Sequence, residues 1–485
     1  MNAFDYFFEN TSKKDDLFLV GKENVSFRQL YNSSLQLATW LKKEFGQKQN
    51  ILLLSVNNQF FLTAYFAIIK SGNVCIPLDP NIEKENFSYI SGLTKPVIIF
   101  MTREVERKLT VEQKCIFPDT LQDYLNKCEF QEDENEFDRE NCAEIIFTSG
   151  STGVPKGVMI SHKNLIANTE SIIKYLKLSH NDRMLVVLPF YYCYGLSLLH
   201  THLRVGGSIV FNNSFIFLGA IINNLLEYKC TGFAGVPSHF QILLRKSDNF
   251  RNTHFPDLRY VTQAGGKLAA VFIDEFRQSF PDVRFIVMYG QTEATARLSY
   301  LPPDLYEEKK GSMGKGIPDV ELKVVNEKGD LIKPGEIGEV IARGDNIMLG
   351  YYADEEGTRN TIRNGWLYTG DLGTVDEDGY IYLTARKKEI IKVGGKRISP
   401  KEIEAVILEL PEVVDCTIEG VEDELLGEAL KATVVIKSDN GKDAMVEKIK
   451  QHCSQNLALY KIPQLFEIKE QFVIAPTGKK IKGKL

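Results

Sequence analysis

Residues 148–157 combine glycines, hydroxyl groups and one cation within a single short loop. The segment reads TSGSTGVPKG and follows an apolar run, 145–147, that is typical of a buried strand. Glycines can adopt positive φ angles and let backbone N–H groups close around an anion. Hydroxyls and a lysine add further donors for a polyphosphate. The segment therefore predicts a loop that binds a nucleotide triphosphate, with a flexible Ser/Gly turn as the alternative, although it is not a Walker A motif.

A second polar cluster stands at residues 289–293, which read YGQTE directly after an expected strand at 284–288. The aromatic face of Tyr289 can stack on a purine, and the hydroxyl of Thr292 can donate to a phosphate. Glu293 offers the oxygen ligands that Mg²⁺ prefers. An ordinary polar turn after a strand is the alternative interpretation.

Together, the two segments resemble motifs of the AMP-forming acyl-adenylate synthetases. This superfamily includes acyl-CoA synthetases, peptide-synthetase adenylation domains and beetle luciferases. The first segment is similar to the family's phosphate loop, and the second matches its Tyr-Gly-x-Thr-Glu motif in the expected order. The resemblance implies that Thr292 and Glu293 serve catalysis and that Glu293 and Thr148 lie at the metal. It implies an ATP site that includes Thr148, Ser149, Gly150, Ser151, Thr152, Gly153, Lys156, Tyr289, Gly290 and Gln291.

Two further segments extend the implied ATP site. Residues 366–371 read WLYTGD and resemble the family's Tyr-x-Thr-Gly-Asp motif, whose aspartate, here Asp371, accepts hydrogen bonds from both ribose hydroxyls. Fifteen residues later, Arg386 resembles the family arginine that contacts the ribose or a phosphate. Residues 263–268 (QAGGKL) stand where the family has a glycine-rich loop against adenine. Gly265, Gly266 and Lys267 are the candidates there, with Lys267 in place of the usual small residue.

The C-terminal part resembles the family's catalytic and thiol-transfer segments. Lys479, in the run PTGKKIKGKL, resembles the terminal catalytic lysine, whose ammonium would neutralise charge in the adenylation transition state. The alternative is a solvated basic tail, and substitution of the neighbours Lys480 and Lys482 should be near neutral if these belong only to such a tail. Lys388 occupies the family's hinge position. Residues 390–404 resemble the loop for thioester formation, with Lys392, Gly394 and Gly395 as candidates.

The acid pocket is the least defined part of the implied site. Residues 189–195 (PFYYCYG) match a family pocket segment, but Tyr192 replaces the common histidine, and Gly195 closes the motif. Residues 234–239 (AGVPSH) resemble another pocket wall, with Val236 and His239 as candidates, although His239 is equally suited to a structural role. No aspartate stands in 189–195 to hold an α-ammonium group, so an amino-acid substrate is disfavoured.

The resemblance predicts an ATP- and Mg²⁺-dependent ligase that forms acyl-AMP from a small carboxylic acid and transfers the acyl group to a thiol. The expected acceptor is coenzyme A, as in fatty acid metabolism, and the phosphopantetheine of an acyl carrier protein is the alternative. The acid itself, whether fatty, aryl or other, stays open. A non-catalytic binder of acyl groups or nucleotides and a luciferase-like oxygenase are the rival functions.

Composition narrows the function classes further. The chain has 485 residues, of which 44% are hydrophobic and 25% are charged, and its net charge is −6, which disfavours a nucleic-acid partner. The eight cysteines form no Cys-x-x-Cys pair, so we expect reduced thiols and no zinc site. Neither a signal peptide nor an apolar run long enough for a membrane span is evident, which predicts a cytoplasmic protein.

The elements that position these residues read as an α/β fold. Apolar runs alternate with helical periodicity after the glycine loop, which predicts parallel strands with helices on both faces and ligands at the carboxyl ends of the strands. We expect a large N-terminal domain (1–387) of doubly wound sheets with a small β-rich subdomain (320–383), and a small mobile α+β C-terminal domain (388–485). The expected strands are 184–188, 208–211, 258–262 and 284–288, and the expected helices are 165–176, with Ser161 as N-cap, 218–226 and 268–280.

Overall fold

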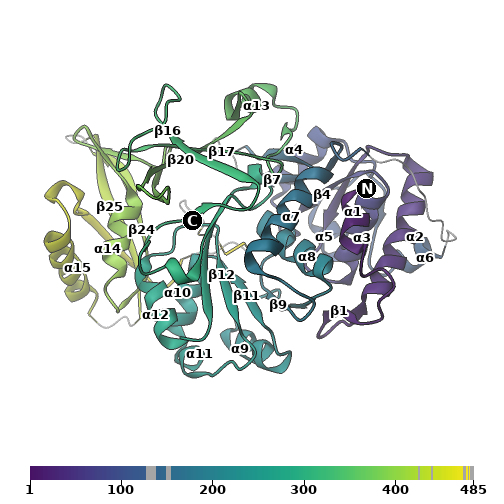
Figure 1. Cartoon of the computed structure of the whole chain (residues 1–485), viewed down its shortest axis with the longest axis horizontal. Coiled ribbons are helices and arrows are strands. Elements are labelled where there is room, and N and C mark those ends of the chain that lie inside the picture. The colour runs from purple at the N-terminus through teal and green to yellow at the C-terminus, as the bar shows by residue number, and fades with distance from the viewer. Residues whose placement is uncertain are drawn as a thin grey trace.

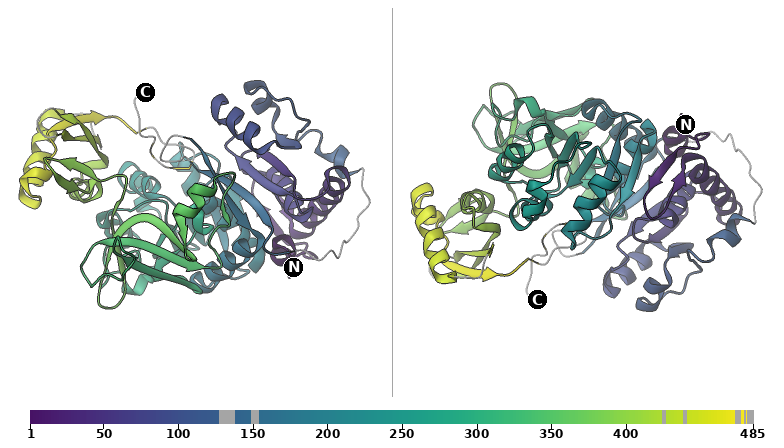
Figure 2. Two further views of the ribbon diagram at one scale, coloured as in Figure 1. Left: turned by 90° about the horizontal axis from the view of Figure 1, so that it is seen from above. Right: turned by 90° about the horizontal axis from the view of Figure 1, so that it is seen from below.

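The computed structural model describes residues 1–126, 138–148, 154–423, 427–437, 441–472, 477–478 and 480. Strands in these ranges form four sheets, which Figure 1 shows with the helices that cover them. Two large sheets and one small sheet make up the body of the molecule. The fourth sheet, with α14 (Pro400–Leu408) and α15 (Lys442–Asn456), forms a lobe at one end of the molecule (Figure 2).

The first large sheet is built mainly from the N-terminal third of the chain. Its strand order is β18-β8-β7-β4-β3-β5-β6, and the pairs among β7, β4, β3, β5 and β6 are parallel. The inner strands β3 and β4 are almost wholly buried, as expected for a parallel sheet covered on both faces. The strands are β3 (Asn50–Leu54), β4 (Val74–Leu78), β5 (Ile98–Met101), β6 (Cys115–Ile116), β7 (Cys142–Thr148), β8 (Lys156–Ser161) and β18 (Gly350–Tyr351). Helices of this region are α1 (Ala3–Phe8), α2 (Phe27–Phe45), α3 (Gln59–Lys70), α4 (Lys84–Thr94), α5 (Arg103–Lys108) and α6 (Leu121–Leu125).

The second large sheet carries most of the expected βα alternation. Its order is β15-β14-β13-β12-β11-β9-β10-β1-β2, with parallel pairing from β13 through to β1. The strands are β1 (Leu17–Val20), β2 (Val25–Ser26), β9 (Arg183–Val186), β10 (Ser208–Phe211), β11 (Gly232–Gly235), β12 (Tyr260–Gln263), β13 (Arg284–Tyr289), β14 (Ser299–Leu301) and β15 (Lys315–Gly316). The helices are α7 (His162–Leu176), α8 (Cys193–Val205), α9 (Leu218–Glu227), α10 (Pro237–Lys246), α11 (Asp248–Asn252) and α12 (Ala270–Ser279).

The expected start of α7 is confirmed in atomic detail. Ser161 accepts a hydrogen bond from the backbone N–H of Asn164, and the Asn164 side chain accepts one from the N–H of Ser161. This reciprocal pair satisfies two N–H groups that a helix start would otherwise leave unpaired. The expected strands and helices of this sheet agree with the observed bounds to within about two residues, the usual uncertainty of element ends.

The third and fourth sheets follow in the chain. The third is antiparallel and contains β16 (Val320–Val325), β17 (Gly338–Gly344), β19 (Ile362–Arg363), β20 (Trp366–Val375) and β21 (Ile381–Arg386), with α13 (Glu355–Thr361) beside it. The fourth contains β22 (Ile391–Val393), β23 (Lys396–Ile398), β24 (Val413–Asp423), β25 (Gly427–Ile436) and β26 (Leu465–Lys469). The α/β class with a large N-terminal and a small C-terminal part is confirmed. The domain boundary at Lys388 stays a prediction; β21 ends two residues before it.

One strand next to the glycine-rich segment was not predicted from the sequence. Residues from Lys156 to Ser161 form β8, which pairs antiparallel with β7, the strand that precedes the segment. Gly157 has no room for a side chain, since a Cβ there would stand 2.8 Å from a methyl group of Ile145 across the pair.

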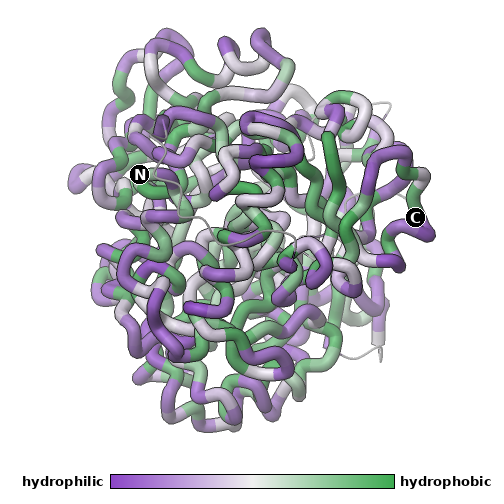
Figure 3. The backbone as a smooth tube through the Cα atoms, turned by 90° about the vertical axis from the view of Figure 1, so that its right-hand side faces the viewer, coloured by the Kyte–Doolittle hydropathy of each residue, from purple (hydrophilic) through white to green (hydrophobic). Residues whose placement is uncertain are grey.

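Apolar side chains of both large sheets pack into an extended core. Figure 3 shows hydrophobic segments (green) concentrated in inner strands and hydrophilic segments (purple) along the outline of the molecule. Of the described cysteines, Cys75, Cys193, Cys230, Cys416 and Cys453 are buried, and none of the seven described cysteines forms a disulfide. Over the described ranges, no helix is long and apolar enough to cross a membrane.

Candidate active site

Four neighbouring strands of the second sheet end at the same edge. Strands β9, β11, β12 and β13 are adjacent and parallel, so their carboxyl ends line up. The segments that follow them are 189–195, 236–239, 264–267 and 290–293, all of which the sequence marked as candidates. Their alignment along one edge is the usual place for a ligand in such a sheet.

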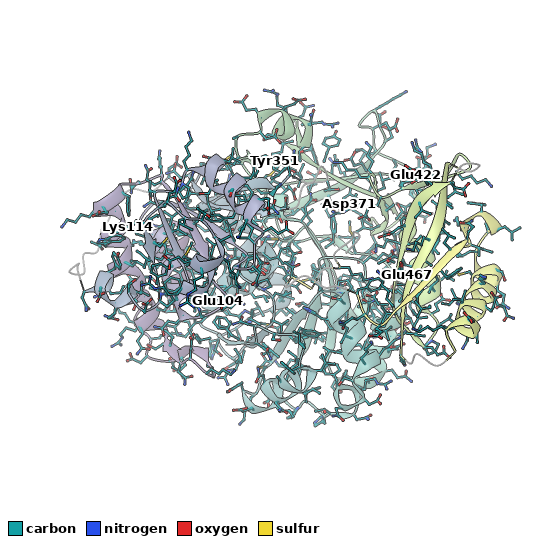
Figure 4. The ribbon with its side chains drawn as sticks, turned by 180° about the vertical axis from the view of Figure 1, so that it is seen from behind. Glu104, Lys114, Tyr351, Asp371, Glu422 and Glu467 are labelled. Carbon is teal, nitrogen blue, oxygen red and sulfur yellow. The ribbon has the colours of Figure 1, made fainter. Side chains whose placement is uncertain are left out.

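Asp371, Tyr289 and Arg386 meet through hydrogen bonds from three strands. The hydroxyl of Tyr289 donates to Oδ2 of Asp371 at 2.6 Å, and Nε of Arg386 donates to Oδ1 at 2.9 Å. Asp371 and Arg386 face each other across β20 and β21. Burial, together with the neighbouring Asp371, raises the pKa of Tyr289 well above its usual range, so the tyrosine remains a donor. Figure 4 shows Asp371 and Tyr351 in the central part of the molecule, between the N-terminal sheet and the C-terminal lobe.

The chain makes a tight turn after β13, and Glu293 lies in this turn. A Cβ on Gly290 would stand 1.9 Å from the carbonyl oxygen of Ala296, so only glycine fits. Thr295 and Ala296 adopt positive φ angles of 59° and 140° in the same turn. Oε1 of Glu293 accepts a hydrogen bond of 2.9 Å from the hydroxyl of Tyr351. The carboxylate is therefore oriented by the protein, and Gln291 stands at the start of the same turn.

Thr292 is less accessible than its expected role implies. Its side chain is buried, and its hydroxyl lies 3.4 Å from the sulfur of Cys193 at the start of α8. The contact ties the turn that carries Glu293 to the helix of the expected acid pocket. Thr292 can thus hold the two segments together.

Lys156 and Thr148 mark the two ends of the glycine loop, whose residues Ser149, Gly150, Ser151, Thr152 and Gly153 lie outside the described residues. The ammonium of Lys156 lies 2.7 Å from a carboxylate oxygen of Asp354 and 4.8 Å from the ring centre of Tyr351. The hydrogen bond from Lys156 lowers the pKa of Asp354. Since the hydroxyl of Tyr351 also contacts Glu293, Tyr351 links Lys156 on β8 of the first sheet to the turn after β13 of the second sheet.

The expected acid-pocket residues form one cluster. A Cβ on Gly265, whose φ is +83°, would lie 3.0 Å from Val236 and 3.3 Å from the hydroxyl of Tyr192. Next to Val236, the ring of His239 stacks on Phe215 with 4.0 Å between centroids. Burial lowers the pKa of His239 to about 3, so its imidazole is neutral.

One candidate glycine is required by close backbone packing. A Cβ on Gly195 would stand 2.2 Å from the carbonyl oxygen of Pro189, where α8 begins against the preceding turn, so packing alone explains this residue. At Gly266 the contact is looser, because a Cβ there would stand 3.2 Å from the ring of Pro237.

The C-terminal segment reaches the same cluster. A Cβ on Gly478 would stand 2.4 Å from Val236 and 2.7 Å from the His239 ring, and the Gly478 carbonyl accepts a hydrogen bond of 2.5 Å from Ser238. Lys479 lies outside the described residues. The alternative that Lys480 is only part of a solvated tail is wrong, because its ammonium lies 2.5 Å from Asp415 and its side chain is 19% exposed.

The remaining candidates lie toward the C-terminal sheet. The ammonium of Lys267 donates to the carbonyl of Leu383 at 2.9 Å, and burial lowers its pKa. Both chain neighbours of Lys388 are held by backbone hydrogen bonds. The N–H of Lys387 donates to the carbonyl of Gly370, and the N–H of Glu389 donates to the carbonyl of Arg386.

Gly394 and Gly395 form the turn of the β22–β23 hairpin. Their φ angles of 54° and 79° are what a two-residue hairpin turn requires, so the turn itself explains both glycines. Lys392 precedes the turn, and its backbone N–H donates to Glu428 on β25. The hairpin is thus anchored to the C-terminal sheet.

Several residues of the site were not identified from the sequence. Tyr351 and Asp354 contact the candidate metal ligand and the loop lysine, and Phe215 covers His239. A Phe-Ile-Phe run at 215–217 is visible in the sequence, but nothing in the sequence indicates what these side chains contact. Ser238 and Asp415 could not be identified from the sequence, because their partners, Gly478 and Lys480, lie more than 60 residues away in the chain.

The groups present fit a magnesium nucleotide. A protein-held carboxylate such as that of Glu293 is a suitable oxygen ligand for Mg²⁺, which commonly takes only one or two carboxylates besides phosphates and water. Consistent with that, no cluster of three or more His, Cys, Asp or Glu side chains suited to a metal occurs in the part of the chain that the structure describes. The Asp371 cluster offers paired acceptors for a diol.

Known proteins are similar to this chain over nearly its whole length. A putative acyl-CoA synthetase of Bacillus subtilis (strain 168), YngI, is 32% identical over 366 residues, which is 74% of this chain and 66% of that protein. The oxalate–CoA ligase of Arabidopsis thaliana is 29% identical and covers 97% of this chain and 95% of its own length.

Solved structures show the same fold. The anthranilate CoA ligase AuaEII in complex with anthranoyl-AMP superimposes with a TM-score of 0.91 at 25% identity, over 99% of this chain and 95% of that one. The o-succinylbenzoate coenzyme A synthetase of Bacillus subtilis with ATP and a magnesium ion gives a TM-score of 0.84 at 25% identity, over 99% and 98%.

The family models match both parts of the chain. The AMP-binding enzyme model matches residues 7–352, and the model of the AMP-binding enzyme C-terminal domain matches residues 402–479. The first match alone spans more than half of the chain. The chain therefore belongs to the AMP-binding enzyme family and is an AMP-forming acid–thiol ligase of the acyl-CoA synthetase type.

Proposed function

We propose that this enzyme uses ATP and Mg²⁺ to activate a small carboxylic acid as acyl-AMP and then transfers the acyl group to coenzyme A. The proposal rests on three groups of residues that lie at the edge of the second sheet where its parallel strands end. These are the Tyr289–Asp371–Arg386 cluster, the oriented carboxylate of Glu293, and Gly478 of the terminal motif against Val236. Relatives that are named CoA ligases support the choice of acceptor.

The nucleotide roles follow from donor and acceptor chemistry. Asp371 accepts from the ribose hydroxyls, and Arg386, already paired with it, contacts the ribose or a phosphate. Glu293 and Thr148 lie at the magnesium, and Lys156 exchanges Asp354 for the polyphosphate held by the glycine loop. The nucleotide-binding part of the site also includes Tyr289, Gly265, Gly266 and Lys267. The hydroxyl of Tyr289 already donates a hydrogen bond to Asp371.

The first half-reaction joins the acid to the nucleotide. A carboxylate oxygen of the acid attacks the α-phosphorus of ATP, the bond to the β-phosphate oxygen breaks, and pyrophosphate leaves. Negative charge accumulates between the carboxylate and the α-phosphate, and a positioned ammonium there stabilises the transition state. We assign that role to Lys479, whose chain neighbour Gly478 contacts the acid pocket.

In the second half-reaction, a thiolate attacks the acyl carbonyl, and AMP leaves. The two half-reactions need different groups at one site, so the C-terminal unit turns about Lys388 and brings in the hairpin with Lys392, Gly394 and Gly395. A hinge absorbs such a motion at few residues, and the anchored neighbours of Lys388 confine it there.

The pocket disfavours an acid that carries an ammonium group. Its described walls are Tyr192, Val236, Phe215 and the neutral His239, none of which can pair with an ammonium group. The named relatives act on oxalate, long-chain fatty acids and 2-succinylbenzoate, so they do not single out one acid. Free thiols in the described residues support a reducing compartment such as the cytoplasm.

The test is pyrophosphate release with ATP and Mg²⁺ across a panel of fatty, aryl and dicarboxylic acids. We expect release with at least one acid that carries no ammonium group, followed by AMP and thioester formation when coenzyme A is added. A second panel replaces coenzyme A with phosphopantetheinylated carrier proteins. Thioester formation on a carrier protein alone would contradict coenzyme A as acceptor. If the protein binds ATP but no acid of the panel causes pyrophosphate release, the result would support a non-catalytic binder.

A further inference from the structure

One side of α10 carries three buried polar residues outside the set of expected site residues. Ser238, Gln241 and Arg245 follow one another at intervals of three and four residues, which places them on one face of the helix. At most 5% of each residue is exposed. A stripe of buried polar side chains must find partners.

All three side chains find partners in the C-terminal part of the chain. Ser238 donates to the carbonyl of Gly478 at 2.5 Å, and Gln241 donates to Oδ1 of Asp415 at 3.0 Å. Arg245 donates to the carbonyl of Leu410 at 3.0 Å. Figure 1 shows α10 next to β24, which begins just after Leu410.

Asp415 is the centre of this contact. Besides Gln241, its Oδ1 accepts from the ammonium of Lys480 at 2.5 Å and from the backbone N–H of Cys416 at 2.8 Å. Lys480 also donates to the carbonyl of Cys416 at 2.9 Å. Burial raises the pKa of Asp415, and the charge of Lys480 opposes that rise. The pair therefore holds the C-terminal segment against β24.

The two anchors stand on either side of Lys479 in the chain. Gly478 is held by Ser238, and Lys480 is held by Asp415. Consecutive Cα atoms are about 3.8 Å apart, so each anchored residue is the direct chain neighbour of Lys479. Holding a charge donor in place beforehand is what makes it effective in a transition state.

We propose that Ser238, Gln241 and Asp415 are positioning residues for acyl-AMP formation, which act by fixing Gly478 and Lys480, the two chain neighbours of the candidate catalytic residue Lys479. The inference rests on the proposed function, because it needs Lys479 to act in the first half-reaction. Two of the contacts join the C-terminal unit to α10 and break if that unit turns: Gln241 to Asp415, and Ser238 to Gly478. They therefore serve the first half-reaction and not the second.

The experiment measures the two half-reactions separately in the full-length enzyme. Acyl-AMP formation is followed by pyrophosphate exchange with the most active acid of the panel. Transfer is followed as thioester formation from the corresponding synthetic acyl-AMP and coenzyme A. The variants are Gln241→Leu, Asp415→Asn and Lys480→Met, with Lys480→Arg as the conservative rescue. Lys450→Ala, which removes an exposed ion pair on α15, is the matched control.

We expect Lys480→Met and Asp415→Asn to slow acyl-AMP formation by about 10- to 100-fold, the range for losing a charged hydrogen bond. Gln241→Leu should slow it by about tenfold, in kcat rather than in the KM for ATP. Transfer should stay within about twofold of the parent in all three variants. Gln241 is separated from Asp415 in that step, and the Asp415–Lys480 pair, which stays intact within the C-terminal unit, then positions no group that acts in transfer. Lys480→Arg should restore most of the first rate, and Lys450→Ala should match the parent in both steps.

A parallel Lys479→Ala variant separates the two ways to fail. If Lys479→Ala forms acyl-AMP at the parent rate, the proposed role of Lys479 is wrong, and the inference falls with it. If Lys479→Ala is slow while Gln241→Leu and Lys480→Met react like the parent, only the inference is overturned. Equal loss of both half-reactions in Gln241→Leu and Lys480→Met would also overturn it, because a general structural defect moves both.

Discussion

Replacing Asp371 by asparagine tests the nucleotide site most directly. The carboxylate is 4% exposed and already accepts from Tyr289 and Arg386, one on each oxygen. Asparagine keeps the shape but turns one oxygen into an N–H donor. The amide oxygen can still accept from Arg386 while the amide N–H donates to the Tyr289 hydroxyl, so the hydrogen bond with Tyr289 reverses, and the site loses its negative charge and one acceptor.

The expected loss follows from the number of charged hydrogen bonds. A hydrogen bond to a charged group contributes about 1.5–3 kcal/mol, and a ribose hydroxyl left without its acceptor loses a similar amount. Each such loss weakens binding by roughly 10- to 100-fold. Since ATP and AMP share the ribose, we expect Asp371→Asn to raise both dissociation constants by about the same factor.

Titration calorimetry with ATP and with AMP measures this prediction without any need to know the acid. Tyr289→Phe is the matched comparison, because it removes one donor to Asp371 and leaves the carboxylate in place. We expect it to weaken both nucleotides by no more than about tenfold. Unchanged affinity for both nucleotides in Asp371→Asn, with a parent-like melting temperature, would refute the ribose assignment.

Further variants test the other parts of the site and the fold. Lys156→Met removes the loop ammonium and should raise the KM for ATP in pyrophosphate release by about tenfold. Phe215→Ala opens the wall beside His239 and should lower the KM for bulkier acids without changing that for ATP. Lys388→Pro restricts φ and should spare acyl-AMP formation while transfer falls; equal loss of both would contradict a hinge there. Burial raises the pKa of Glu144 to about 7 from 4.5, so its ionisation weakens folding as the pH rises through that interval. Glu144→Gln should be neutral near the lower pH and stabilising by about 3 kcal/mol at pH 8 in denaturant titrations; a constant difference across pH would contradict this.

The doubly wound second sheet could be predicted because its signals are local. Apolar runs and helical periodicity identify β9, β10, β12 and β13 with the helices α7, α9 and α12, and Ser161 stands where its side chain can cap a helix. The hairpin of β7 and β8 was missed for the opposite reason. Whether the residues after a glycine loop continue as helix or strand depends on the neighbouring strand, and that pairing is not local.

Motif residues of the site could also be predicted, but their partners could not. Asp371 and Arg386 stand fifteen residues apart, a spacing that a hairpin makes into a direct contact. By contrast, Lys156 meets Asp354 nearly 200 residues away, and no local pattern marks that aspartate. Lys480 looked like one more lysine of a basic tail, because the buried carboxylate that pairs with it lies on β24.

The contact between α10 and the C-terminal part has the chemistry of an interface that opens. Arg245 keeps a charged partner in its own unit, since its guanidinium lies 2.6 Å from Glu275 and 4.1 Å from the ring centre of Phe272 on α12. Asp415 likewise keeps Lys480, which belongs to the same C-terminal part.

An unpaired buried ion is strongly destabilising. Separation of the two units would avoid this cost, because both charges keep their partners. What is lost are hydrogen bonds from Ser238, Gln241 and Arg245, and water can replace these at about 1 kcal/mol net each. A purely apolar contact of the same extent would resist opening through its whole buried area. The polar stripe thus specifies one arrangement of the C-terminal unit while keeping the barrier to leaving it low, as a reaction in two half-steps at one site requires.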